Sequence, residues 1–409
     1  MIKKSIDYKL FLSILALIVF WMIMISSVSV YSSFKLTNSY VIKGFIEETY
    51  NYFYVIRNIS HVIISVTIIW LLSKLDYRFF EKYIKVIAWI ILIMLFYVLI
   101  AWTNLKWASW WINIPWLPSI QPTEFLKFGL IIFLAYFFKN YKNYLWDFKK
   151  GFLPFLWIIW IVVILVWLQP DFWTLMVILP VSIIMYFVTW ANLKNLAIFW
   201  LMWIFLIVWI YSSWKYDKET WKSLNGLWYI TKRIDNFLAP NEESISNQTI
   251  NYQTKQGLIA IWSWWFTGLW FGWSIQKFWY LPEVQGDFIF SVIVEELGFI
   301  WAFMLLNIYL FIAYRGFYIA NYINDLFAKY SAIWISSWIL IQAFINIWVN
   351  LNIVPLTWIT LPFVSYGWSS MLSLAIAIWF LLNISRHIND KPKYSRSIHN
   401  NNIFIRKYK

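Results

Sequence analysis

The chain contains no cysteine, which excludes disulfide bonds, thiolate metal ligands and cysteine nucleophiles together. Only three histidines occur, His61, His387 and His399, and they are too scattered along the sequence to predict a histidine-based metal site. Charged residues make up 13% of the 409 residues, whereas an average soluble domain has about 25%. The scarcity of charge, together with 62% hydrophobic residues, indicates a protein that lies in lipid.

Glycine is also scarce, with 11 residues against 33 tryptophans. An average chain of this length has roughly 29 glycines, and membrane helices are richer in glycine than soluble ones. Trp160, Trp167 and Trp209 fall deep inside hydrophobic runs, whereas Trp usually gathers near the membrane interfaces. The composition is therefore abnormal even for a membrane protein.

The formal net charge of +14 does not predict a nucleic-acid partner. In a membrane protein such an excess usually lies on cytoplasmic loops that face anionic lipid. The first hydrophobic run is too long for a cleavable signal peptide and lacks a small-residue cleavage site, so we expect it to remain as a span.

Hydrophobic runs that are long enough, or nearly so, to cross a bilayer predict an all-α, polytopic membrane protein with about ten transmembrane helices. They cover residues 8–30, 53–73, 84–102, 122–138, 152–168, 172–190, 195–213, 287–313, 330–350 and 356–383. The turn Gln169-Pro170-Asp171 separates spans five and six, because Pro170 cannot continue a helix without losing a hydrogen bond. A large outer loop, residues 214–286, is expected between spans seven and eight and should be partly ordered.

The distribution of Lys and Arg predicts the orientation. If the N-terminus is inside, most basic residues fall on inner segments, and the short outer loops hold only Lys35, Lys43 and Lys106. The positive-inside rule then places both termini in the cytoplasm, which requires an even number of spans. We therefore predict a membrane domain over residues 1–386 and a basic cytoplasmic tail over 387–409.

Ionisable residues at the membrane edge are costly, so each is a functional candidate. Glu124 and Lys127 stand three residues apart, just after Pro122, at the outer start of the fourth span. The spacing fits a local ion pair in the first helical turn and a functional pair equally well. Asp171 is explained better as the N-cap of the sixth span, although that role does not exclude a second one.

The densest polar cluster lies where the outer loop re-enters the membrane. Lys277, Glu283 and Asp287 come together there, and Asp287 immediately precedes an apolar helix, a position that suits a general base. An N-cap role for Asp287 is the alternative, but it does not explain why the three residues converge. Glu295 and Glu296 lie two turns deeper and are expected to bind neighbouring helices or backbone amides.

Lys232 and Arg233 stand among aromatic residues in the outer loop. This mixture suits a diphosphate and a sugar, because guanidinium groups match phosphate oxygens and aromatic rings stack on sugar faces. A solvated amphipathic helix on the membrane interface explains the same pattern equally well.

Taken together, segments spread over nearly the whole chain resemble the SEDS family of peptidoglycan glycosyltransferases, FtsW and RodA. The matching segments are QPTEFLK at 121–127, QPD at 169–171, KRIDNFLAP at 232–240, QKFWYLPEVQGDFIFSVIVEELGF at 276–299, LPFVSYGWSS at 361–370 and LLNISRH at 381–387. Six such segments in order make the resemblance specific. The KFWYLPE segment leans towards the FtsW branch, which serves cell division, and the RodA branch, which serves elongation and cell shape, remains open.

The resemblance implies an enzyme that polymerises lipid II into glycan strands at the outer face of the cytoplasmic membrane. The family's proposed catalytic aspartate corresponds to Asp287, and its other site residues correspond to Glu124, Lys127 and Asp171. A base would deprotonate the acceptor 4-hydroxyl, which would attack the anomeric carbon bearing undecaprenyl diphosphate with inversion. A divalent cation, Mg²⁺ or Mn²⁺, would help to neutralise that leaving group, and no organic cofactor is expected. The implied partners are the undecaprenyl-diphosphate-linked glycan, a class B penicillin-binding protein as transpeptidase, and other divisome proteins.

Two other function classes remain open. A transporter of lipid-linked precursors would need a charged site near the membrane midplane and inverted repeats, whereas here the charges gather at the outer mouth and no repeat is visible. A non-enzymatic scaffold for division or elongation proteins would suit the basic tail. Strand synthesis by the purified protein separates both from the enzyme.

The resemblance also bears on the tryptophan excess, because this chain has Trp where the family repeatedly has Gly. Examples are Trp173, Trp264, Trp265, Trp270, Trp273, Trp279, Trp358 and Trp368. Trp can supply neither the positive φ nor the close helix approach that Gly permits. We hypothesise that the gene comes from a bacterium that reads UGA as Gly, and that these codons were rendered here as Trp.

Overall fold

The computed structural model describes residues 5–102, 112, 119–169 and 171–189, isolated positions between 194 and 212, and residues 227–238, 245–263, 266–282 and 284–388. Within this part of the chain every regular element is a helix, and one isolated bridge joins Ile112 to Ile120. The all-α prediction is confirmed for these residues.

Long helices stand at the predicted spans that fall in the described residues. They are α1 (Tyr8–Val28), α3 (Phe53–Leu72), α5 (Ile84–Trp102), α6 (Pro122–Asn140), α7 (Leu153–Leu168), α8 (Phe172–Val188), α14 (Ile289–Tyr322), α15 (Leu326–Asn350) and α16 (Trp368–Ser385). Among the described residues, 6 helical stretches are long and apolar enough to cross a membrane, and α5 and α8 carry shorter apolar stretches. The predicted seventh span, 195–213, lies largely outside the described residues.

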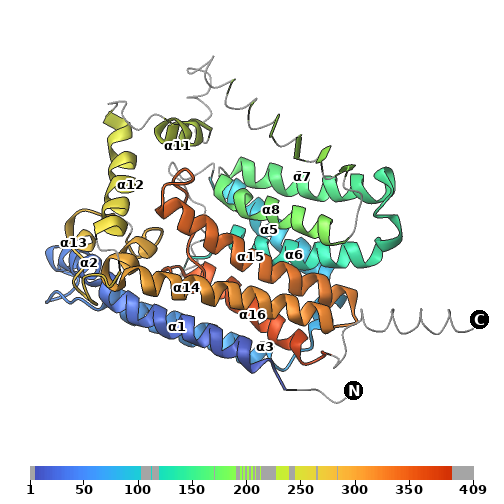
Figure 1. Cartoon of the computed structure of the whole chain (residues 1–409), viewed down its shortest axis with the longest axis horizontal. Helices are drawn as coiled ribbons and strands as arrows, with labels where there is room; N and C mark the ends of the chain where they lie inside the picture. The colour runs from blue at the N-terminus through green and yellow to red at the C-terminus, as the bar shows by residue number, and fades with distance from the viewer. Residues whose placement is uncertain are drawn as a thin grey trace, which may run out of the picture.

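Shorter helices lie between and beside the long ones. They are α2 (Val30–Ile42), α4 (Tyr77–Lys82), the 3₁₀ turn η1 (Lys142–Tyr144), the π-helical turn η2 (Phe148–Phe152), α11 (Leu227–Leu238), α12 (Ile245–Ser263) and α13 (Gln276–Trp279). Helices α2, α11, α12 and α13 gather at one end of the bundle (Figure 1). At the opposite end, the backbone N–H of Asp7 donates to Ser385 Oγ at 3.0 Å, which joins the start of α1 to the end of α16. The expected partial order of segment 214–286 is therefore seen in α11, α12 and α13.

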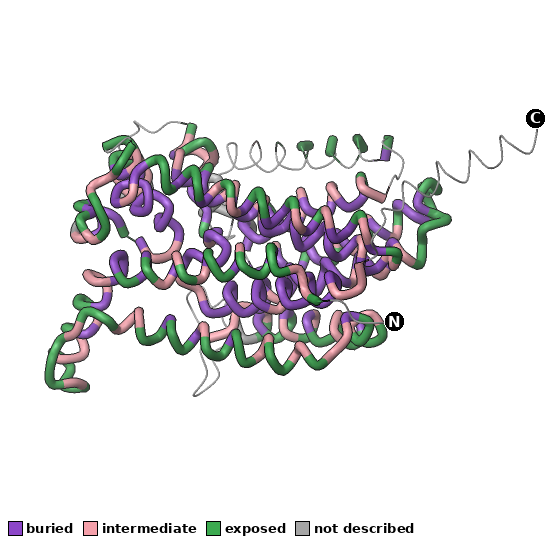
Figure 2. The backbone as a smooth tube through the Cα atoms, turned by 60° about the horizontal axis from the view of Figure 1, so that its bottom comes forward, coloured by how far each residue is buried: buried purple, intermediate pink, exposed green. Residues whose placement is uncertain are grey.

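Helix α15 runs through the middle of the bundle and packs against α14, α6, α8 and α16. Buried residues concentrate on these inner helices, while exposed residues follow the outer faces of the bundle (Figure 2). Helix α3 is the extreme case of an outer helix, because its only buried residues are Asn58, His61 and Ser65. The core is thus centred on α15, which also supplies side chains to the polar site described below.

The final span begins later than the sequence predicts. The apolar run from residue 356 suggests a helix, but α16 starts only at Trp368, and residues 353–367 contain no helix. Side-chain amides of α15 donate hydrogen bonds to main-chain carbonyl groups of this segment. Asn346 Nδ2 donates to Ile359 O at 2.8 Å, and Gln342 Nε2 donates to Thr360 O at 3.0 Å. These two carbonyl groups are bonded to another helix, so this part of the segment does not become helical beside α15.

Helix α14 is interrupted at Gly298, where φ is 76° and ψ is −178°. A neighbouring loop enters the break, and Leu269 N donates to Glu295 O at 2.8 Å. The backbones approach so closely that a Cβ on Gly298 would lie 2.3 Å from Phe266 O, and a Cβ on Gly268 would lie 2.4 Å from Glu296 O. Only glycine fits at both positions.

Candidate active site

The first part of the site is an ion pair in the opening turn of α6. The helix begins at Pro122, whose missing N–H needs no partner at a helix start, and this position confirms the predicted boundary. Lys127 Nζ lies 2.8 Å from Glu124 Oε2, and both side chains are buried. The pairing expected from their spacing is therefore confirmed, in surroundings where an unpaired charge would be costly.

Asp171 approaches this ion pair from α8. Its carboxylate accepts hydrogen bonds from Thr174 N at 3.3 Å and from Thr174 Oγ1 at 2.8 Å, so the predicted N-cap role is confirmed. Asp171 also lines a small polar cavity together with both members of the ion pair. The other lining residues are Gln121, Trp173, Thr174, Val177, Gln342, Trp358, Ile359 and Thr360. The structure thus brings Glu124, Lys127 and Asp171 to one buried polar cavity.

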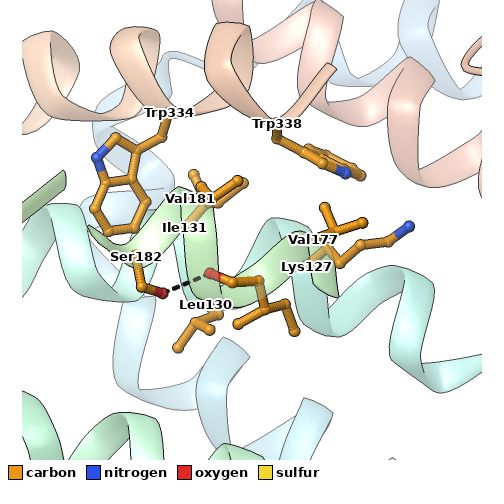
Figure 3. A pocket seen from close by; sticks show the side chains of 9 residues that line it. Lys127, Leu130, Ile131, Val177, Val181, Ser182, Trp334 and Trp338 are labelled. Carbon is orange, nitrogen blue, oxygen red and sulfur yellow. Dashed lines mark hydrogen bonds between the residues drawn. The ribbon is translucent and has the colours of Figure 1, made fainter. Parts of the chain in front are cut away.

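A narrow apolar hollow adjoins the polar cavity and shares Lys127 and Val177 with it. Its walls come from α6, α8 and α15, with Trp334 at one end and the amine of Lys127 at the other (Figure 3). The hydroxyl of Ser182 donates to Ile178 O within its own helix, so it adds little polarity to the hollow. Lys127 therefore stands at the boundary between a polar and an apolar space.

Arg233 lies at the rim of the polar cavity. Its guanidinium carbon is 5.1 Å from the ring centroid of Trp173 and 4.6 Å from that of Trp358, and both rings line the cavity. Its Nη1 donates to Leu356 O. Burial lowers the pKa of Arg233, and the negative charge of Asp287 opposes that shift. The side chain of Lys232, its neighbour in α11, is outside the described residues.

Asp287 is buried, with 9% of its surface exposed, and stands just before α14. The N-cap of that helix is Phe288, so the alternative N-cap role for Asp287 is wrong. The main-chain oxygen of Asp287 accepts hydrogen bonds from Asn350 Nδ2 at 2.8 Å and from Asn346 Nδ2 at 3.1 Å. Asp287 is also close enough to Arg233 for the two charges to interact.

The salt-bridge partner of Lys277 is Glu296. Its Nζ lies 2.7 Å from Glu296 Oε1 and donates also to Ser27 Oγ at 2.7 Å and to Gly272 O at 2.9 Å. These contacts match the three hydrogens of a buried ammonium group, so in this structure Lys277 is engaged by the protein itself. Glu283, the third residue of the predicted convergence, lies outside the described residues.

Glu295 and Glu296 organise the loop that leads to α14. Glu295 Oε1 accepts from Ile275 N at 3.0 Å and from Gln276 N at 3.2 Å, while Glu296 Oε2 accepts from Gly272 N at 3.1 Å. The prediction that these two carboxylates bind backbone amides is confirmed. Their role is to hold the loop in place.

Gln342 was not singled out from the sequence, yet its side chain connects Lys127 to Thr360 across the cavity wall. Its Oε1 accepts from Lys127 Nζ at 3.0 Å and from Trp338 Nε1 at 2.8 Å, and its Nε2 donates to Thr360. The available signal was an amide in the middle of an apolar run, repeated at four-residue spacing by Asn346 and Asn350.

The donor set of the cavity does not fit a resident divalent cation. Among the described residues no group of three or more His, Cys, Asp or Glu could hold a metal ion. The cavity offers the carboxylates of Glu124 and Asp171, of which one is paired with Lys127 and the other caps α8. No step is assigned to a protein-bound metal.

Comparison with known proteins identifies the family. The profile of the FtsW/RodA/SpoVE family, described as cell cycle proteins, matches residues 8–390. The chain belongs to this family. It is 32% identical to stage V sporulation protein E of Bacillus subtilis over 388 residues, which cover 94% of this chain and 98% of the relative. It is 30% identical over 400 residues to the probable peptidoglycan glycosyltransferase FtsW of Wigglesworthia glossinidia brevipalpis, covering 95% and 96% of the two chains.

Solved structures of the SEDS family share the fold of this chain. A chain from a peptidoglycan synthase complex that coordinates polymerization and crosslinking superposes with a TM-score of 0.72 at 20% identity, covering 95% of this chain and 99% of the other. The rod shape determining protein RodA of Thermus thermophilus gives a TM-score of 0.62 at 19% identity with the same coverage. This chain is accordingly a SEDS protein with the architecture of a multi-pass membrane protein.

Proposed function

We propose that this chain is a peptidoglycan glycosyltransferase that polymerises lipid II into glycan strands at the outer face of the cytoplasmic membrane during cell division. The observation that carries the proposal is the buried polar cavity of Glu124, Lys127 and Asp171 with Arg233 and Asp287 at its rim. It occurs in a chain whose relatives named as probable peptidoglycan glycosyltransferases match it over most of its length.

Asp287, Arg233 and Lys127 each have a role in the proposed reaction. Asp287 accepts the proton of the acceptor 4-hydroxyl, whose oxygen forms a bond to the anomeric carbon of the donor as the bond from that carbon to the diphosphate oxygen breaks. The electron pair leaves with undecaprenyl diphosphate, and inversion follows from attack on the opposite face. Arg233 and Lys127 are the cations that can face the diphosphate, where charge develops in the transition state.

The neighbouring apolar hollow supports an amphiphilic substrate. A lipid-linked diphosphate sugar needs a charged subsite next to an apolar one, and Lys127 stands at such a boundary.

The proposed orientation places the joined ends of α1 and α16 in the cytoplasm and α11, α12 and α13 outside. The basic residues near both termini support this orientation. A class B penicillin-binding protein is the proposed partner, because a chain of the same fold forms part of a synthase complex that polymerises and crosslinks. Strand synthesis and crosslinking would then occur on one side of the membrane.

A RodA-like role in elongation is the second candidate, supported by the RodA neighbours in structure. Depletion of the protein in its own cells separates the two: filaments support the division role, and rounded cells support the elongation role. A precursor transporter would move labelled lipid II between leaflets of a vesicle without forming any polymer.

The decisive test is polymerisation of purified lipid II by the protein in detergent, with its transpeptidase partner present. The wild-type protein should produce glycan strands, and Asp287→Ala and Asp287→Asn should reduce the rate by about 10²–10⁴-fold, the usual contribution of a general base. Wild-type rates in both variants would remove Asp287 from the mechanism. A well-folded wild-type protein that makes no strands would overturn the proposed function.

A further inference from the structure

Three side-chain amides form a row along one face of α15. Gln342, Asn346 and Asn350 are spaced four residues apart, and at most 1% of each is exposed. Residues at this spacing share a helix face. In a helix that is otherwise largely apolar, a completely buried amide row is retained only where each member has a specific bonding partner.

Asn350 is inserted into the first turn of α14. In an uninterrupted helix the N–H of Ser291 would donate to the carbonyl oxygen of Asp287, four residues earlier. Here Asn350 Nδ2 donates to Asp287 O at 2.8 Å, while Asn350 Oδ1 accepts from Ser291 N at 3.2 Å and from Ser291 Oγ at 2.7 Å. The side-chain amide thus stands between the two main-chain groups and satisfies both of them.

The consequence is that α14 starts only after Asp287. The helix begins at Ile289 with Phe288 as its N-cap, and Asp287 stays in the turn before it. Were the Asp287–Ser291 bond formed directly, Asp287 itself would take the capping position and its carboxylate would turn towards the free N–H groups of the first turn. Asn350 therefore prevents Asp287 from becoming the N-cap residue of α14.

Asn346 fixes the same carbonyl group from the other side. Its Nδ2 donates to Asp287 O at 3.1 Å and to Ile359 O at 2.8 Å. Ile359 follows Trp358, the ring that stacks on Arg233. The main chain of Asp287 and the cation at the cavity rim are consequently held by one extended segment and one helix face.

We propose that Asn350 and Asn346 are positioning residues that hold Asp287 out of α14 and direct its carboxylate to the cavity rim. Neither residue touches the reacting atoms. The inference rests on the proposed function for its activity readout, and it adds two residues to that mechanism that act through the main chain of Asp287.

The test uses the isosteric variants Asn350→Asp and Asn346→Asp in the full-length protein with lipid II as substrate. Asn350→Asp keeps the acceptor for Ser291, removes the N–H donors to Asp287 O and Asn346 O, and places a carboxylate oxygen beside them. The matched control is Ser337→Ala, which removes a buried hydroxyl from the same helix that donates only to Ile333 O of its own turn. Rates are expressed per folded molecule, measured from the monodisperse fraction in detergent.

We expect each Asn variant to lower kcat about 10–100-fold, because displacing a reacting group by about 1 Å costs on that order. KM for lipid II should stay within about twofold, since substrate binding is not the step affected. A wild-type kcat per folded molecule, or a rise in KM at constant kcat, would overturn the inference. If the proposed function is wrong, neither the wild type nor Ser337→Ala will make strands. If only the inference about Asn346 and Asn350 is wrong, both of these proteins will make strands.

Discussion

Lys277 Nζ lies 2.7 Å from Glu296 Oε1, and the two side chains are exposed by only 2% and 0%. The pair joins the loop before α14 to α14 itself and, through Ser27, to α1. The sequence marked Lys277 as a functional candidate because of its charge at the membrane edge, and the structure shows that its ammonium group is bound by the protein itself. Its location distinguishes it from Lys127, which also has a partner carboxylate but faces a cavity.

Replacing Lys277 with Met should destabilise the protein without changing substrate affinity. Loss of one partner leaves the Glu296 carboxylate buried and unpaired, which costs about 3–5 kcal/mol of unfolding free energy. Thermal unfolding in detergent should show the loss, and adding Glu296→Gln in the same chain should recover most of it. A normal unfolding temperature with a raised KM for lipid II would instead show that Lys277 contacts substrate.

Replacing Lys127 with Met should also destabilise the protein, and adding Glu124→Gln should recover stability by the same reasoning. Strand synthesis should remain low in this double variant, because the cavity has lost the charge that faces a diphosphate. The comparison with the Lys277 pair separates structure from function within one protein. A double variant with the wild-type rate would show that the Glu124–Lys127 pair only stabilises the start of α6.

Replacing Arg233 with Gln should shift the acid side of the pH–rate profile to higher pH. The attraction that opposes the lowered pKa of Arg233 acts equally on Asp287, so the neighbouring cation favours the ionised carboxylate. Without it, the base is lost at a higher pH. Arg233→Lys should restore the profile in part, and Lys149→Met, which removes an exposed cation, should leave it unchanged. An unshifted profile in Arg233→Gln would contradict the coupling.

Replacing Trp270 with Gly should stabilise the protein. Trp270 has a φ of 79° and stands between Gly268 and Gly272, whose φ angles are 67° and 87°. A bulky residue in this region costs about 1–2 kcal/mol, whereas glycine adopts it freely. Trp262→Gly, in the exposed helical turn of α12, should instead lower stability by about 1 kcal/mol. Equal effects of the two substitutions on thermal unfolding would contradict this prediction.

The hypothesis that UGA is read as Gly makes a direct prediction about the native protein. Peptide mass spectrometry over residues 262–279, on protein isolated from its own cells, should find glycine at Trp270 and Trp273. Tryptophan at both would rule the hypothesis out. If Trp173 and Trp358 are also glycine in the cell, Arg233 lacks its two flanking rings and the polar cavity is larger.

Removal of divalent cations should slow strand synthesis, and the protein purified without substrate should carry no bound metal. The described residues provide no group of three suitable ligands, so any cation would bind together with the diphosphate. Chelation should lower the rate, and Mg²⁺ or Mn²⁺ should restore it with a dependence on lipid II concentration. A metal retained in stoichiometric amount through gel filtration would indicate a protein site that includes residues beyond those described.

Local sequence signals predicted the helix starts well, because their chemistry is contained in a few neighbouring residues. Pro122 opens α6 and Asp171 caps α8 as expected. The apolar run from residue 356 was misleading, because hydropathy does not reveal that amides on α15 occupy the carbonyls of that segment.

The site was predicted in the same uneven way. Glu124, Lys127, Asp171 and Asp287 stand out as ionisable groups near lipid, and the charges of Lys277 and Arg233 look alike in the sequence. Lys277 is paired with Glu296, whereas Arg233 lies over the ring of Trp358. Neither partner is adjacent in the sequence, so the sequence alone does not distinguish the two cations. The amides of α15 carry no charge and were overlooked for that reason.

The break at Gly298 has a mechanical consequence. A continuous α-helix transmits bending and rotation along its whole length, but α14 is two rods joined at a glycine, with a loop wedged between them. The first part begins next to Asp287 and is held to that loop through Glu295 and Glu296, whereas the second part continues to Tyr322. We therefore expect a bending force applied near Tyr322 to act on the joint at Gly298 before it reaches the carboxylate of Asp287.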